Sequence, residues 1–187
     1  DIDGTTNLDI VDIDGALTQD GGAVFNEASA DVDFRIESNG NDHMFFVDAG
    51  NNHINIGTAT DLGGNLNVNG HIVSSRDDNG DNLTLISTDA DANSGPNLKL
   101  IRDSSSPADG DVGGVISFVS ENDASEAITY SEIKSLIDDA SDGTEDGRLF
   151  FNTMVAGSLT ERLRFNGTET AFNEGSADID FRIESNG

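Results

Sequence analysis

The sequence has no cysteine and no tryptophan, and among its 187 residues it has only two prolines and one tyrosine. The absence of cysteine excludes disulfides and cysteine-based metal sites. Lysine and arginine are scarce as well, with nine of them against 36 Asp and Glu, which gives a net charge of −27. A surface of that sign repels phosphates and anionic lipid headgroups, so we expect no nucleic-acid partner.

Long apolar runs are also missing. No segment approaches the roughly 20 apolar residues of a membrane span, so we expect no membrane insertion. Hydrophobic residues make up 35% of the chain, against roughly 45–50% in ordinary globular domains, a figure that also counts glycine. Disorder would suit this composition, but strand-like alternation recurs from end to end. We therefore expect a thin core extended along an axis, with neighbouring chains supplying part of the burial.

A sixteen-residue motif occurs twice, at Phe25–Gly40 (FNEASADVDFRIESNG) and at Phe172–Gly187 (FNEGSADIDFRIESNG). The copies agree at fourteen positions, and apolar residues alternate with polar ones in both, which predicts a strand with one buried face. The inward positions, the structural core of the repeat, are expected at Val32, Phe34 and Ile36 and at Ile179, Phe181 and Ile183. We expect both copies to share one conformation, with a polar turn before each strand (Asn26–Ala30, Asn173–Ala177) and glycine at its end.

The expected fold is all-β, an elongated homotrimeric fibre of short strands with β-helix-like or β-prism-like rungs and small antiparallel β-meander modules. Closing three chains around an axis would remove the unpaired edges of such strands. The repeat and the first residue, Asp1, also lead us to expect a piece of a longer modular protein. The expected segments are a thin fibre-like leader (1–24), a first β-repeat module (25–76), connecting strands and loops (77–112), an antiparallel β-meander (113–165) and the start of a second repeat (166–187).

Within these segments, alternation and turn residues predict individual strands. Residues 25–57 read as a three-stranded meander, and Leu66, Val68 and Ile72 continue the alternation. Two short strands are expected at Leu83–Ile86 and Leu98–Ile101. The four strand candidates of the meander module are Val115–Ser120, Ile128–Ile137, Leu149–Met154 and Leu159–Phe165. Glu126–Asp138 also fits a helical stripe, but the turn that follows it favours a strand.

Candidate chemistry is sparse. His43, His53 and His71 each begin a strand, and we interpret them as solvated; in a trimer, one His per chain could instead bind a metal on the axis. Asp89–Gly95 resembles the start of an EF-hand, but Leu100 stands where the bidentate Glu belongs, so the match fails. A looser Ca²⁺ site stays an alternative, because hard cations accept any converging oxygens. No nucleophile motif or phosphate loop is present, and no carboxylate pair stands out, so we expect neither an enzyme nor a cofactor.

Three stretches carry a family resemblance. They are VFNEASADVDFRIESNGNDHMFFVDAGNNHINIGT, NLTLISTDADANSGPNLKLIRDSSSPADGDVGGVISFVSENDASE and SDGTEDGRLFFNTMVAGSLTERLRFNGTETAFNE. They resemble the repetitive shaft modules of phage tail fibres, most closely those of tailed phages of marine bacteria, over most of residues 22–187. The resemblance implies an extracellular, homotrimeric fibre in the virion that contacts other tail proteins and helps to attach the particle to a host receptor. It implies no catalytic residues, and it does not locate the receptor-binding region.

Two other classes share parts of this pattern. A secreted bacterial adhesin or surface-layer β-repeat protein would have the same acidity and β-modules, and it would fold with calcium. A tailspike that cleaves surface polysaccharide would need two carboxylates roughly 5–9 Å apart in a cleft. Fold-level analogy alone does not separate the three classes.

Overall fold

The computed structural model describes residues 11–26 and 28–173, and every regular element in these residues is a β-strand. The strands are β1 (Phe34–Ser38), β2 (Asn41–Asp48), β3 (His53–Ile56), β4 (Leu66–Val68), β5 (Val112–Glu121), β6 (Ala127–Asp139), β7 (Asp146–Val155), β8 (Ser158–Phe165) and β9 (Thr170–Phe172). The chain divides into two compact units, Asp1–Thr84 and Leu85–Gly187, and each unit holds one sheet. The prediction of an all-β fold is confirmed.

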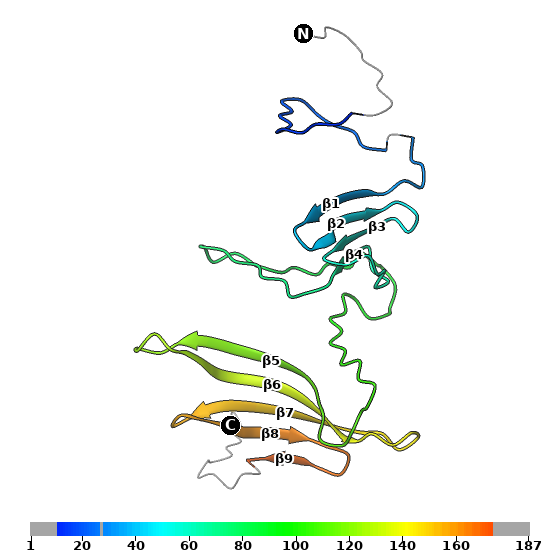
Figure 1. The fold of residues 1–187 in the computed structure, drawn as a ribbon. Helices are drawn as coiled ribbons and strands as arrows, with labels where there is room; N and C mark the ends of the chain where they lie inside the picture. The colour runs from blue at the N-terminus through cyan, green and yellow to red at the C-terminus, as the bar shows by residue number, and fades with distance from the viewer. Residues whose placement is uncertain (1–10, 27, 174–187) are drawn as a thin grey trace. The chain divides into compact units, whose positions relative to one another are not determined.

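The first unit contains a four-stranded mixed sheet in the order β1-β2-β3-β4 (Figure 1). β1, β2 and β3 form the antiparallel meander that the alternation predicts. β4 instead pairs parallel to β3, with Ile54 opposite Leu66 and Ile56 opposite Val68. The chain thus returns to the same end of the sheet after twelve residues, which is the local geometry of one β-helix step.

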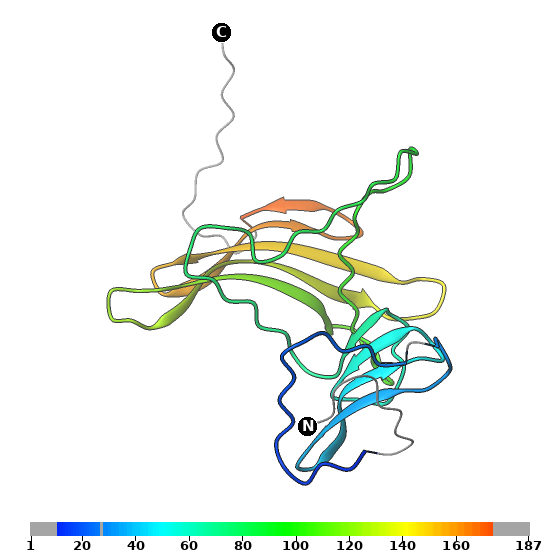
Figure 2. The same ribbon diagram turned by 90° about the horizontal axis from the view of Figure 1, so that it is seen from above.

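The second unit contains a five-stranded antiparallel meander, β5-β6-β7-β8-β9, and its strands lie side by side (Figures 1 and 2). All four predicted strands of 113–165 are present, and β6 resolves the ambiguous stretch as a strand. β6 pairs with β5 along one edge and with β7 along the other. Its residue Ile133, for example, lies opposite Ile116 of β5 and Phe151 of β7. β9 was not predicted, and it places Phe172 opposite Leu163.

Three sequence expectations need correction. Leu83–Ile86 and Leu98–Ile101 form no strand within the chain, and the alternation after β4 does not carry Ile72 into a strand. Leu83, Leu98 and Ile72 are exposed. An isolated strand of this length needs a neighbour that satisfies its backbone and covers its apolar face. The pattern in these segments is therefore that of a strand, but the single chain provides no ladder partner.

The hairpin between β7 and β8 offers a test of local backbone strain. Val155 pairs with Ser158 across a two-residue turn in which φ is 44° at Ala156 and 83° at Gly157. Two positive φ values define a turn that favours Asn-Gly, and alanine is strained there. Ala156→Asn is expected to raise the free energy of unfolding by about 0.5–1 kcal/mol, measured by urea denaturation. Ala156→Val should lower it, and an Asn variant that unfolds more easily would contradict the turn assignment.

Candidate functional site

The acidic loop that resembles an EF-hand start is folded onto itself. The Asp89 carboxylate accepts the backbone N–H of Asp91 at 3.2 Å. The Asp91 carboxylate accepts both the backbone N–H of Asn93 at 2.8 Å and its side-chain amide at 2.6 Å. Within the part of the chain that the structure describes, no three or more His, Asp or Glu residues are grouped as metal ligands. The calcium alternative stays a prediction.

The three histidines do not come together in the chain as one site. His43 Nδ1 lies 2.7 Å from Asp42 Oδ1, and His53 Nδ1 lies 2.9 Å from Asp61 Oδ1. His71 is exposed outside any strand. The pair at His53 ties the β3–β4 connection to the start of β3. Binding of a metal by histidines on a trimer axis stays a prediction.

Four described carboxyl groups have a pKa below the ordinary value, and in each the main cause is a hydrogen bond from a residue at most three positions away. These pKa values belong to Asp42 beside His43, Asp48 beside Asn51, Asp78 beside Arg76 and Asp139 beside Ser141. Acid–base catalysis by two carboxylates works differently, because the environments push the two pKa values apart. The shifts therefore mark turns and local ion pairs.

The first sheet presents one uncharged apolar surface. Its strand register brings eight apolar side chains onto the same face. This first apolar face consists of Phe34, Ile36, Phe45, Val47, Ile54, Ile56, Leu66 and Val68. Residues 25, 26 and 28–32 lie beside one end of it, where the Phe25 and Phe34 rings are 4.8 Å apart. The rest is open, and Leu66 is 62% exposed.

The opposite face of this sheet is polar, yet it contains the best-buried residues of the unit. Asn55 is 0% exposed, Asn67 4% and Phe46 7%. The Asn67 amide donates to Asn55 Oδ1 at 2.7 Å, and Asn67 Oδ1 accepts the backbone N–H of Gly64 at 3.0 Å. The β3–β4 connection therefore covers this face, and the asparagines form a two-member ladder between parallel strands.

Two residues of the predicted repeat core, Phe34 and Ile36, lie on the first apolar face, where Phe34 pairs with Val47 and Ile36 with Phe45. Val32 precedes β1. The single chain leaves Val32 60% and Ile36 51% exposed, and burial of these side chains stays a prediction. The second copy's Ile179, Phe181 and Ile183 lie outside the described residues. Asn173, which is described, has the same φ of 58° as its counterpart Asn26.

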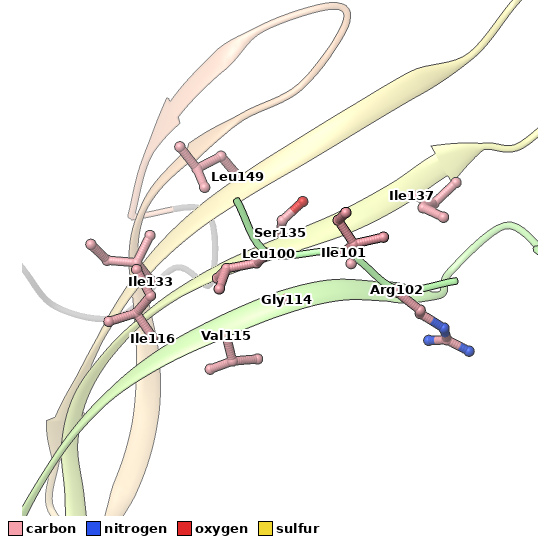
Figure 3. A pocket seen from close by; sticks show the side chains of 11 residues that line it. Leu100, Ile101, Arg102, Gly114, Val115, Ile116, Ile133, Ser135, Ile137 and Leu149 are labelled. Carbon is pink, nitrogen blue, oxygen red and sulfur yellow. The ribbon is translucent and has the colours of Figure 1, made fainter. Parts of the chain in front are cut away.

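The second sheet repeats this arrangement. Residues that lie opposite one another on neighbouring strands form rows across the sheet from β5 to β9. Two adjacent rows hold no charged side chain, and seven of their residues are large and apolar. This second apolar face consists of Ile116, Ile133, Leu149, Phe151, Leu163, Phe165 and Phe172. Near β5, Leu100 and Ile101 lie over the face and leave a hollow of about 430 Å³ (Figure 3). Leu149 and Ile116 line this hollow and remain partly exposed.

The other face of the second sheet holds paired charges around a buried aromatic ring. Phe150 is buried, with Lys134 Nζ 5.2 Å and the Arg148 guanidinium 5.6 Å from its ring centre. Arg148 also binds Asp138 at 2.7 Å. Three of the chain's nine basic residues, counting Arg164, lie on this face in rows that contain or adjoin Phe150. The charges of Lys134 and Arg148 are thus paired with acidic side chains within the chain.

Large apolar side chains remain exposed on both apolar faces of the single chain. Ile36 is 51% and Leu66 62% exposed on the first face, and Ile116 and Phe165 are each 41% exposed on the second. Such side chains are among those that proteins most often bury, and contiguous exposed apolar surface is typical of sites of protein association. The two apolar faces are therefore the candidate functional site.

Comparisons with known proteins add no identification. No protein-family model matches the chain, and neither the curated proteins nor the solved structures yield a match. Among the residues described, there is also no helix long and apolar enough to cross a membrane.

Sequence reasoning identified the alternating residues but missed which faces the single chain buries. The parallel step could have been found from the twelve-residue offset between His53-Ile54-Asn55-Ile56 and Asn65-Leu66-Asn67-Val68, which have the same alternation. Asparagines at equivalent positions of adjacent parallel strands, such as Asn55 and Asn67, can form hydrogen bonds with each other between the strands. No comparable pattern marks Phe150 as the buried ring of the second sheet.

The asparagine pair can be tested by comparing a single with a double substitution. Asn67→Ala leaves Asn55 Oδ1 buried without its donor, so we expect a loss of about 1–3 kcal/mol in the free energy of unfolding. Asn55→Val combined with Asn67→Val removes both partners and should recover part of that loss. Asn65→Ala, at an exposed position beside β4, is the control and should change little. Equal effects of the Asn67 and Asn65 variants in urea denaturation would show that the ladder does not contribute.

Proposed function

We propose that this chain is a structural part of a phage tail fibre, a shaft module that associates with copies of itself and carries the host-attachment function of the virion. The observation that carries the proposal is the uncharged apolar face that each sheet leaves open. A single-layer sheet needs a second layer over such a face. The fitting partner of a shaft module is another copy of the same module.

The charge distribution supports a structural rather than a catalytic role. Acidic side chains gather in turns and on the polar faces, where many bond to nearby residues, as Asp48 does with Asn51 and Asp138 with Arg148. The two apolar faces hold none of the chain's charged residues. A contact between like-charged chains is favourable only where charge is absent or paired, so these faces are the surfaces on which copies can approach.

The resemblance to tail-fibre shafts supplies the number of copies, the virion setting and the expectation of other tail proteins and a host receptor as partners. The β-helix-like step from β3 to β4 supports an elongated fibre, because such steps add rungs along an axis. In the homotrimer, Val32, Phe34 and Ile36 face the axis.

The first experiment measures mass and shape in solution. Light scattering and sedimentation velocity on the full chain should give three times the monomer mass and a high frictional ratio. Immunogold electron microscopy with antibodies against the chain should label fibres on the tails of the phage. A stable folded monomer would overturn the assembly. Folding that requires calcium would favour the adhesin class instead.

The inward assignment of the repeat is tested by Phe34→Asp. An unpaired charge on the first apolar face would be buried in every copy. We expect it to cost about 3 kcal/mol or more per chain, and the assembly bears this cost once for each copy. We expect dissociation and a lower melting temperature. Asn39→Asp adds the same charge in the exposed turn after β1 and should leave both unchanged. An unaltered melting temperature for the Phe34 variant would refute the assignment.

A further inference from the structure

Two nearly identical pentapeptides lie between the sheets in the sequence. Asn82–Ile86 reads NLTLI and Asn97–Ile101 reads NLKLI, so the segments differ only at Thr84 and Lys99. Both have the alternation of a strand, and neither forms one within the chain. The two segments therefore share a strand sequence that the single chain leaves unpaired.

The second pentapeptide, Asn97–Ile101, packs against the apolar face of the second sheet. The side chain of Leu100 lies over Gly114 of β5, where its Cβ and Cδ1 would be 3.4 Å from an added Cβ (Figure 3). Leu100 therefore packs directly against the sheet at Gly114. Beyond Leu100, the hollow of the second apolar face continues over Ile133 and Leu149.

The first pentapeptide is about as exposed as the second. Leu83 is 71%, Leu85 47% and Ile86 78% exposed, and the equivalent values at Leu98, Leu100 and Ile101 are 63%, 54% and 74%. Leucine and isoleucine are among the residues that proteins most often bury, so these apolar side chains are available for another chain to cover. The position equivalent to Lys99 is the uncharged Thr84, so Asn82–Ile86 brings no charged side chain into such a contact.

We propose that Asn82–Ile86 of one chain docks into the hollow on the second apolar face of another copy, beside that copy's own Asn97–Ile101. Leu83 and Leu85, two residues apart on one side of the segment, lie against Ile133 and Leu149 of the second copy. The proposal rests on the self-association proposed above, and it specifies which segment is exchanged.

Disulfide trapping tests the docking directly, because the chain has no cysteine of its own. In the full chain, Leu85→Cys combined with Leu149→Cys should give covalent multimers on a non-reducing gel after mild oxidation. A disulfide requires the two Cβ atoms to lie about 3.5–4.5 Å apart, so trapping reports close contact. Leu85→Cys combined with Ser117→Cys is the matched control, since Ser117 pairs with Glu132 on the opposite face of the sheet. This control should give no multimers.

The remaining outcomes are separable. Multimers that form equally well in the Ser117 control, or a disulfide within one chain, would overturn the docking. A trimer by light scattering that gives no Leu85–Leu149 multimers would overturn the docking and leave the proposed function intact, whereas a monomer would overturn both. As a second measurement, Leu85→Asp should weaken self-association by about tenfold or more. Ser87→Asp, at an exposed position outside the pentapeptide, should not, and equal effects of the two would contradict the proposal.

Discussion

The dominant constraint on this structure is that each sheet is a single layer whose apolar face remains open in the chain. Hydrophobic burial is the main favourable contribution to folding, at about 25 cal/mol per Å² of apolar surface. Here the side chains best placed to supply it, such as Ile36 and Leu66, remain half exposed or more. Full burial of the first and second apolar faces requires a second layer over each of them. In the association proposed above, folding and association would be linked, as in obligate oligomers that have no stable monomer.

The polar faces contrast with the apolar faces, because they are the better-buried side of each sheet. In the first sheet, the β3–β4 connection covers Asn55 and Asn67. The Asn67 amide donates to Asn55 Oδ1, while Asn55 Nδ2 is buried without a hydrogen-bond partner. In the second sheet, the charged ends of Lys134 and Arg148 lie over the Phe150 ring and near acidic partners. Buried polar groups are costly unless they are paired, so a contact that broke these pairs would be disfavoured. In each sheet the apolar face is the side left more exposed.

Sequence periodicity predicted the strands of both sheets well, because alternation reports directly which residues share a face. It could not predict burial. Phe34 and Ile36 read as core, and in the chain they lie on the open face, since burial depends on what lies above a sheet rather than on its pattern. The parallel pairing of β4 was missed because alternation alone does not give the direction of a short strand. The signal for it was the recurrence of the β3 pattern twelve residues later. Leu83–Ile86 and Leu98–Ile101 were predicted as strands from real patterns, but a pattern supplies no ladder partner.

Charge decides which contacts between copies are physically open. Chains of net charge −27 repel one another, and at physiological ionic strength that repulsion reaches only about 8 Å. Acids in the turns, such as Asp48 and Asp139, lie at strand ends, away from the uncharged middle of each apolar face. Contact between those middles is short-ranged and is not weakened by screening, whereas the opposing repulsion is. Salt is therefore expected to shift the balance toward association in the assembly proposed above.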